Sequence, residues 1–261
     1  MSPLSVHELQ PGTARFDAGC AWAVAHGDEA LLFLADLASP LRQHAVFFGA
    51  FRGEQVCAVG VRFHALAPAT FSCAAQDRES CAALIDAGVQ SELVLVTHAQ
   101  QVLPGHLQAL PADVDTWLTG ECQRTARAPE VGALVDAAEL ASFYALHGMR
   151  HFHPDMLRFG HYFGVRDDAG ALLCAGGVQF VIAALGYAQV GGLVTAPHAR
   201  GRALATRVLA GISGSLAADG VQHCGLFADA AAPHLTAFYA ARGFRVRGSF
   251  AFRTLNRGAG R

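Results

Sequence analysis

Two kinds of hydrophobic pattern alternate along the second half of the chain. Leu204, Val208, Ile212 and Leu216 recur every four residues, which predicts one buried face of a helix. Between glycine- and aspartate-rich turns, short runs of β-branched and aromatic residues predict strands. These strands cover residues 161–165, 171–182, 186–194, 223–228 and 244–252.

Two further helices are expected from their first residues. Asp136 is a typical N-cap with Glu139 three residues later, and Pro233 suits the first position of a helix that Gly243 ends. Strands and helices therefore alternate, and the second half is predicted to be an α/β domain that begins with a strand at residues 131–135.

The first half repeats part of this pattern. CAVGVRF at 57–63 and CAGGVQF at 174–180 agree in five of seven letters, and each lies in a predicted hairpin. In the first half the hairpin covers residues 45–51 and 56–63. A strand at 70–74, a helix at 79–87 and another strand at 92–96 then follow. The matched order favours a duplicated fold with a mixed sheet over chance similarity in a chain rich in alanine, glycine and valine.

The two copies differ in length at one place. Gly60 and Gly88 are 28 positions apart, whereas the matching Gly177 and Gly220 are 43 apart, so the first copy is 15 residues shorter. The segment it lacks is the one holding VTAPHARGRALA. Residues 119–130 are polar and are interpreted as a linker, which predicts domains at 1–128 and 129–261.

Composition limits the functions to be considered. The 261 residues are 52% hydrophobic and 15% charged, with a net charge of −2, so we expect a folded chain and no electrostatic attraction to nucleic acid. No signal peptide or membrane-spanning run is found, and seven scattered cysteines are typical of a reducing compartment. We therefore expect a cytoplasmic protein without a membrane partner. The oligomeric state stays open.

The segment missing from the first copy carries the candidate chemistry. After the predicted strand, a proline turn leads through Arg200, Gly201, Arg202 and Ala203 into a helix. Small residues let backbone N–H groups approach a ligand, and a helix N-terminus favours anions such as a pyrophosphate. The alternative is an ordinary helix start with two solvated arginines.

This segment resembles the acyl-CoA motif of the GNAT N-acetyltransferase superfamily, which is Gln or Arg, two residues, Gly, any residue, then Gly or Ala. Here it reads His198-Ala-Arg-Gly201-Arg-Ala203, with His198 departing from the pattern. FYAARGF at 238–244 is similar to the family's Tyr-x-x-x-Gly-Phe ending, although Ala232 stands where many members have asparagine. The resemblance covers residues 131–252 and extends to the first half only as a degenerate copy without either motif.

The resemblance implies a GNAT-like fold in two tandem copies and an acetyl-CoA-dependent N-acetyltransferase. A primary amine of a small-molecule or peptide acceptor would attack the thioester directly in a ternary complex. A backbone N–H near Val194 would stabilise the oxyanion, and Tyr239 would protonate the leaving thiolate. Phe152, His153 and Met156 would shape the acceptor pocket. The implied cofactor-binding residues are Leu193, Val194, Thr195, Arg200, Gly201, Arg202, Ala203, Leu204 and Ala205.

Several alternatives stay open. The motif strand has no carboxylate, so the general base is unassigned among Asp229, His153, His161, His223 and a water chain. HFHPD at 151–155 could suggest a metal, but no second ligand cluster accompanies it, and no metal is expected. Tyr239 could be a core aromatic. The rival functions are a non-catalytic acyl-CoA sensor or scaffold, and transfer of a longer acyl chain.

Overall fold

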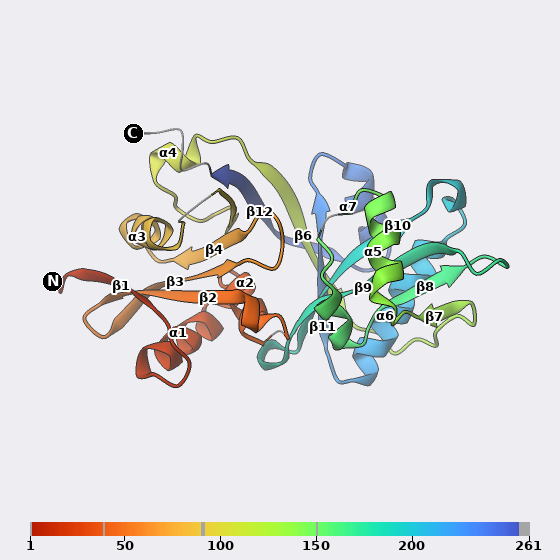
Figure 1. Cartoon of the computed structure of the whole chain (residues 1–261), viewed down its shortest axis with the longest axis horizontal. Coiled ribbons are helices and arrows are strands. Elements are labelled where there is room, and N and C mark those ends of the chain that lie inside the picture. The colour runs from red at the N-terminus through yellow and green to blue at the C-terminus, as the bar shows by residue number, and fades with distance from the viewer. Residues whose placement is uncertain (1, 39, 90–91, 150, 256–261) are drawn as a thin grey trace. The chain divides into compact units, whose positions relative to one another are not determined.

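A computed structural model describes residues 2–38, 40–89, 92–149 and 151–255, and its elements form two compact units (Figure 1). The first unit contains Met1–Trp117, Ala228–Leu235 and Arg247–Arg261; the second contains Leu118–Phe227 and Thr236–Val246. Each unit therefore takes segments from both halves of the chain. Whether 1–128 and 129–261 fold as domains stays a prediction.

The first unit is built on six strands in the order β1-β2-β3-β4-β5-β12. Neighbouring strands are antiparallel except β4 and β5, which are parallel. The strands are β1 Leu4–Glu8, β2 Ala45–Arg52, β3 Gln55–Phe63, β4 Thr70–Ala75, β5 Leu93–His98 and β12 Arg245–Leu255.

Helices cover both faces of this first sheet (Figure 1). On one face, Gly19 of helix α1 leaves room for Leu9, since an added Cβ would lie 2.8 Å from its Cδ1. On the other face, Leu84 of α3 packs in a cluster with Phe48 and Phe71. The helices are α1 Ala14–Ala25, α2 Leu31–Ala38, α3 Arg78–Gly88 and the short α4 Gly105–Gln108.

The second unit repeats the order of the first. Its strands run β7-β8-β9-β10-β11, with β6 following β11. The first three pairs are antiparallel and the fourth, β10 with β11, is parallel, as in the first unit. The strands are β6 Asp113–Glu121, β7 Val131–Ala133, β8 Phe163–Arg166, β9 Leu172–Ile182, β10 Tyr187–Thr195 and β11 His223–Asp229. The predicted mixed α/β sheet and the order expected of a duplicated fold are thus confirmed.

Adjacent glycines of β9 show how the second sheet is covered. Gly176 faces helix α6 (Leu204–Ala218), because an added Cβ would lie 3.4 Å from Ile212 Cδ1. Gly177 faces the opposite side, where an added Cβ would lie 2.3 Å from the ring of Tyr162. On that side lie α5 (Ala137–Leu146) and the 3₁₀ helix η2 (Pro154–Phe159), and Figure 1 shows α5 and α6 on opposite faces.

Most predicted elements are present, with ends shifted by a few residues. The helix expected from Pro233 is α7 (Pro233–Ala240), and Asp136 caps α5 by accepting from the backbone N–H groups of Ala138 and Glu139. The predicted linker was wrong in its first residues, because β6 continues to Glu121. Strands β1 and β6 and helices α1 and α2 were not predicted.

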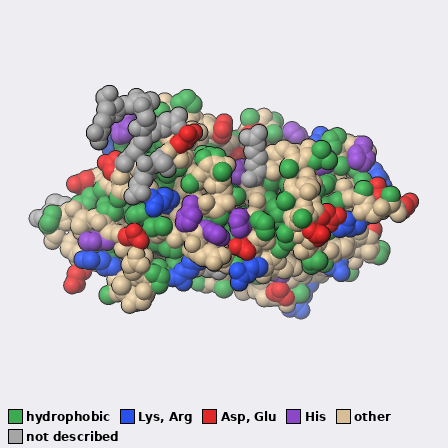
Figure 2. All heavy atoms as spheres, in the orientation of Figure 1, with side chains coloured by type: hydrophobic (Ala, Val, Ile, Leu, Met, Phe, Trp, Pro, Cys, Tyr) green, Lys and Arg blue, Asp and Glu red, His purple; other side chains and the backbone are tan. Residues whose placement is uncertain are grey.

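No described helix is both long and apolar enough to cross a membrane. On the face of the molecule drawn in Figure 2, acidic and basic side chains are interspersed. This face carries no broad region of one charge, which agrees with the near-neutral composition.

Candidate functional site

Strand β10 loses its neighbours towards its C-terminal end. Its pairing with β11 ends at Gln189 and Gly225, although β10 continues to Thr195. On its other side the register with β9 shifts between Gly191 and Val194, which leaves a bulge. The end of β10 therefore offers an edge of backbone N–H and C=O groups towards the side that β11 has left.

The predicted β10 residues lie along this edge. Leu193 lies in the bulge and turns towards the α6 face, where an added Cβ on Gly176 would meet it at 2.9 Å. Val194 pairs with Ala175, and the hydroxyl of Thr195 donates to Cys174 Sγ at 3.2 Å. Their side chains are thus fixed by the sheet, and their backbone is what a ligand along the edge would meet.

The connection between β10 and α6 leads into a helix N-terminus that no side chain caps. A 3₁₀ turn at Pro197–Ala199 comes first, and then Gly201 (φ +76°) and Ala203 (φ +57°) adopt the left-handed conformation. The first helical bond runs from Arg207 N–H to Ala203 C=O, and no side chain caps the helix. The N–H groups of Leu204 and Ala205 are therefore available to an anion.

Arginines surround this helix start in two different ways. Arg207 is used structurally, because it pairs with Glu130 and donates to the Arg202 carbonyl at 2.7 Å. Arg200 and Arg202 are exposed. Among the described residues their guanidinium groups make one hydrogen bond, from Arg200 Nε to the Thr195 carbonyl at 3.4 Å. Both can turn towards an anion at the helix.

Ala203 is the one described residue other than glycine with positive φ, and this gives a stability prediction. The left-handed conformation costs an L-residue about 1 to 2 kcal/mol. We expect Ala203→Gly to raise the free energy of unfolding by about 1 kcal/mol in urea titrations. Ala210→Gly, inside α6, should lower it by about 1 kcal/mol. A destabilised Ala203→Gly protein would contradict the described backbone.

The equivalent helix of the first unit, α3, has an N-terminus that a side chain of the chain already caps. Only Gln76 and Asp77 separate β4 from α3, whereas residues 196–203 separate β10 from α6. Asp77 caps α3 by accepting from the backbone N–H of Ser80 at 2.8 Å, and it also accepts from Arg52 at 2.8 Å. The carboxylate of the chain itself occupies the position that an anion would take.

This cap predicts a pH-dependent contribution to stability. Arg52 and the Ser80 N–H lower the pKa of Asp77 to about 2, below its value of about 3.9 in an unfolded chain. The contribution is complete above about pH 4 and is lost as the pH falls towards 2. Asp77→Ala should cost about 1 kcal/mol at pH 7, and the melting-temperature difference from wild type should shrink below pH 4.

The neighbouring Glu79 provides the matched control, because it also pairs with Arg52 but its side chain is 71% exposed. Glu79→Ala should change stability by less than about 0.5 kcal/mol. Equal losses in the two variants, or a difference independent of pH, would contradict the capping role of Asp77.

Helix α7 carries Tyr239, the residue predicted to protonate the leaving thiolate. Tyr239 is half-buried with its ring edge-on to those of Phe238 and Phe244, and its hydroxyl has no hydrogen-bond partner among the described residues. Burial raises the pKa of Tyr239 to about 12, although the positive charge of Arg242 opposes the shift. The phenol therefore keeps its proton throughout the neutral range.

Arg242 connects α7 to the first turn of α6. Its Nε and Nη2 donate to the hydroxyl of Thr206 at 3.0 and 2.5 Å, and its guanidinium stacks 3.6 Å from the ring centroid of Phe238. This contact fixes the helix that carries Tyr239 against the helix whose N-terminus has no side-chain cap.

The three predicted acceptor residues lie on the α5 side of the sheet. Phe152 lies between Tyr144 and Tyr162, with ring centroids 5.2 and 5.8 Å away. Met156 is buried and accepts from the Tyr162 hydroxyl at 3.7 Å. These residues form one aromatic cluster beneath β9 and β10.

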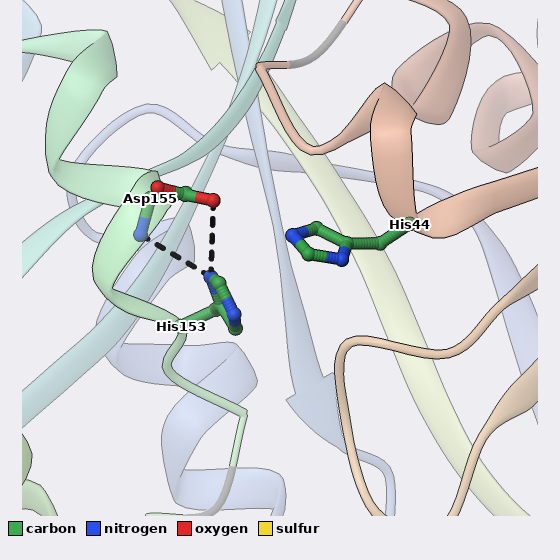
Figure 3. A group of neighbouring side chains, drawn as sticks. All are labelled: His44, His153 and Asp155. Carbon is green, nitrogen blue, oxygen red and sulfur yellow. Dashed lines mark hydrogen bonds and ion pairs between the residues drawn. The ribbon is translucent and has the colours of Figure 1, made fainter.

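His153 has a structural contact of its own. Its Nδ1 accepts from the backbone N–H of Asp155 at 3.2 Å, which caps η2, and the Asp155 carboxylate lies 3.8 Å away (Figure 3). His44, also drawn there, belongs to the first unit. Within the described part of the second unit, no third ligand joins His153 and Asp155 to hold a metal.

Two of the candidate bases lie away from the helix start. His161 is buried against Ser215 and Asp219, near the C-terminal end of α6. Ser215 itself lies about 16 Å along the helix from Leu204, at 1.5 Å per residue. His223 is paired with Tyr187, at the opposite end of β10 from Thr195. A third candidate, Asp229, is the last residue of β11, and its carboxylate accepts from the backbone N–H of Ala231 in the turn that follows.

One residue of this region was missed by sequence reasoning. Tyr144 of α5 is 1% exposed, and its hydroxyl lies against Gly192 in the β10 bulge without a hydrogen-bond partner among the described residues. A tyrosine on an apolar helix face is indistinguishable from a core aromatic in the sequence, so no pattern could have identified it.

The chain matches no protein-family model and no curated protein sequence. Solved structures nevertheless share its fold. A structure from Novosphingobium aromaticivorans, assigned to the GNAT family of acetyltransferases, is 24% identical with a TM-score of 0.56, over 76% of this chain and 87% of that one. A GCN5-related N-acetyltransferase from Sphaerobacter thermophilus is 16% identical with a TM-score of 0.61, over 98% and 97%.

A third match concerns the duplication. A tandem GNAT protein from the clavulanic acid biosynthesis pathway is 15% identical with a TM-score of 0.60, over 99% of this chain and 100% of that one. Identities this low show the fold alone. The chain has the GNAT acyltransferase fold, as the sequence predicted.

Proposed function

We propose that this protein is an acetyl-CoA-dependent N-acetyltransferase whose second unit binds the cofactor and performs the reaction. The observation that carries the proposal is the combination of an unpaired β10 edge with an uncapped α6 N-terminus that follows it directly. The first unit has the same succession of strands but a helix capped by Asp77, so we assign it a structural role.

Backbone groups of β10 and α6 would bind both the pantetheine arm and the pyrophosphate of the cofactor. The pyrophosphate would accept from the N–H groups at the start of α6, with Arg200 and Arg202 adding charge. The pantetheine arm would pair with the free edge of β10 like an added strand, as far as Leu193 and Val194. The thioester would then lie at the bulge.

The position of the helix start suggests a second register for the family motif. Residues 200–205 follow the pattern of Arg, two residues, Gly, any residue, then Gly or Ala at every position except one, where Ala203 replaces the first glycine. In this register the left-handed conformation of Ala203 has a reason, because that position favours glycine. The departure then falls on Ala203 instead of His198.

The reaction forms an N–C bond and breaks the C–S bond. The neutral amine attacks the thioester carbonyl, whose oxygen becomes an oxyanion held by a backbone N–H near Val194. Collapse of this intermediate expels the thiolate of coenzyme A, which takes a proton from Tyr239. The nitrogen releases its surplus proton, which restores the phenol through water, so the products are an amide and a free thiol.

The pKa values show why these transfers must be coupled. A phenol with a pKa of about 12 does not spontaneously protonate a thiolate whose acid has a pKa of about 8.5. The proton lost by the cationic nitrogen of the intermediate makes the overall transfer favourable. Since β10 has no carboxylate, we assign that proton to water.

The test is thiol release from acetyl-CoA over a panel of primary amines, small molecules and peptides with free N-termini. We expect at least one amine to increase the rate over the background without amine, and mass spectrometry to find its acetylated product. Acetyl-CoA binding without turnover on the whole panel would favour the non-catalytic acyl-CoA sensor instead. Comparing acetyl-CoA with longer acyl-CoA chains would establish the acyl preference.

A further inference from the structure

The β10 bulge contains a feature that the proposed mechanism does not use. Gly192 has φ +59°, and a Cβ added to it would lie 2.8 Å from the hydroxyl oxygen of Tyr144. The Tyr144 hydroxyl thus lies directly against the backbone at the point where β10 and β9 lose register. Its ring reaches this place from α5, on the face of the sheet that also holds Phe152.

The Tyr144 hydroxyl is buried and makes no hydrogen bond to the described residues. Tyr144 is 1% exposed, and its oxygen has no hydrogen-bond partner among the described residues. Leaving such a group unpaired costs free energy that a phenylalanine would not cost. Burial also raises the pKa of Tyr144, so the group is a neutral phenol able to donate.

The neighbouring Tyr162 shows that burial alone does not explain this. It is 3% exposed on the same face, yet its hydroxyl donates to Met156 Sδ at 3.7 Å. Of these two buried tyrosines, only the one at the bulge lacks a partner.

We propose that Tyr144 is a catalytic residue that donates a hydrogen bond to the acyl carbonyl oxygen of the bound thioester. This proposal rests on the proposed function, which places the thioester at the bulge. The backbone N–H near Val194 would donate to the same oxygen from the strand, and Tyr144 would donate from the α5 face. Both bonds would strengthen as the carbonyl becomes an oxyanion. The phenol keeps its own proton throughout.

The proposal can be tested by binding, without knowing the acceptor. Acetyl-CoA is compared with S-ethyl-CoA, a thioether in which a CH₂ group replaces the carbonyl. We expect the wild type to bind acetyl-CoA about tenfold more tightly, and Tyr144→Phe to lose most of this preference. Tyr162→Phe is the matched control and should keep it. Without ligand, Tyr144→Phe should melt a few degrees higher, because the unpaired hydroxyl is gone.

The outcomes separate this inference from the proposed function. Wild type that binds neither molecule would refute the proposed function, and the inference with it. Wild type that prefers acetyl-CoA, with the same preference in Tyr144→Phe, would refute only the role of Tyr144. With an acceptor in hand and acetyl-CoA at saturation, Tyr144→Phe should lower kcat by about 10- to 100-fold, in addition to its weaker binding of acetyl-CoA.

Discussion

Ending the chain at Phe244 should abolish folding, because it removes β12 from the first unit. Phe250 and Leu255 of this strand are 1% and 7% exposed, and β12 is the antiparallel partner of β5. Each buried side chain of this size contributes about 2 to 5 kcal/mol, so their joint loss approaches the whole stability of a typical domain. We expect aggregated protein, seen by size-exclusion chromatography and circular dichroism.

The control removes only residues 256–261, which leaves β12 complete, and should behave as wild type. The same reasoning applies to residues 1–128 expressed alone, which also lack β12. A monomeric and cooperatively folding 1–128 fragment would contradict the exchange of strands between the halves, and would support a simple boundary near residue 128.

Replacing Tyr239 with phenylalanine should lower kcat by about 100-fold and leave acetyl-CoA affinity within twofold of wild type. The hydroxyl is needed only when the thiolate leaves, so its loss affects the reaction and not the ground state. Because the pKa of Tyr239 is raised to about 12, the wild-type rate should show no decline from its ionisation below about pH 11. Stopped-flow detection of thiol release across this pH range provides the measurement.

Phe238→Leu serves as a control for packing, since it alters the ring against Tyr239 without removing a hydroxyl. It should lower stability more than Tyr239→Phe does, and should lower kcat less. Full activity in Tyr239→Phe would assign the residue to the aromatic core, which was the alternative raised by the sequence.

The sequence predicted the parts of this structure that depend on local pattern. The four-residue repeat of α6, the hairpins and the cap at Asp136 are all decided by neighbours a few positions apart. The difference between the two copies was visible in part. Eight residues, 196–203, precede α6 where the first copy has only Gln76 and Asp77, which accounts for six of the 15 residues. The rest is spread over longer elements, such as the 15 residues of α6 against the 11 of α3.

The remaining features depend on contacts distant in sequence. The place of β12 beside β5 is decided by pairing between residues 93–98 and 250–255, which no local pattern records. The cap of α3 by Asp77 is local, but the lowered pKa of its carboxyl depends on Arg52, which lies 25 positions earlier in the chain. Tyr144 became informative only once its hydroxyl was found unpaired at Gly192.

The central claim is that the α6 N-terminus binds the phosphates of acetyl-CoA, and calorimetric titration tests it most directly. Wild type should bind acetyl-CoA with micromolar affinity, and Arg200→Ala/Arg202→Ala should bind it about 10- to 100-fold more weakly. Arg124→Ala/Arg245→Ala removes two other exposed arginines of the second unit and should bind as wild type does. No binding to wild type, or equal losses in both double variants, would contradict the account.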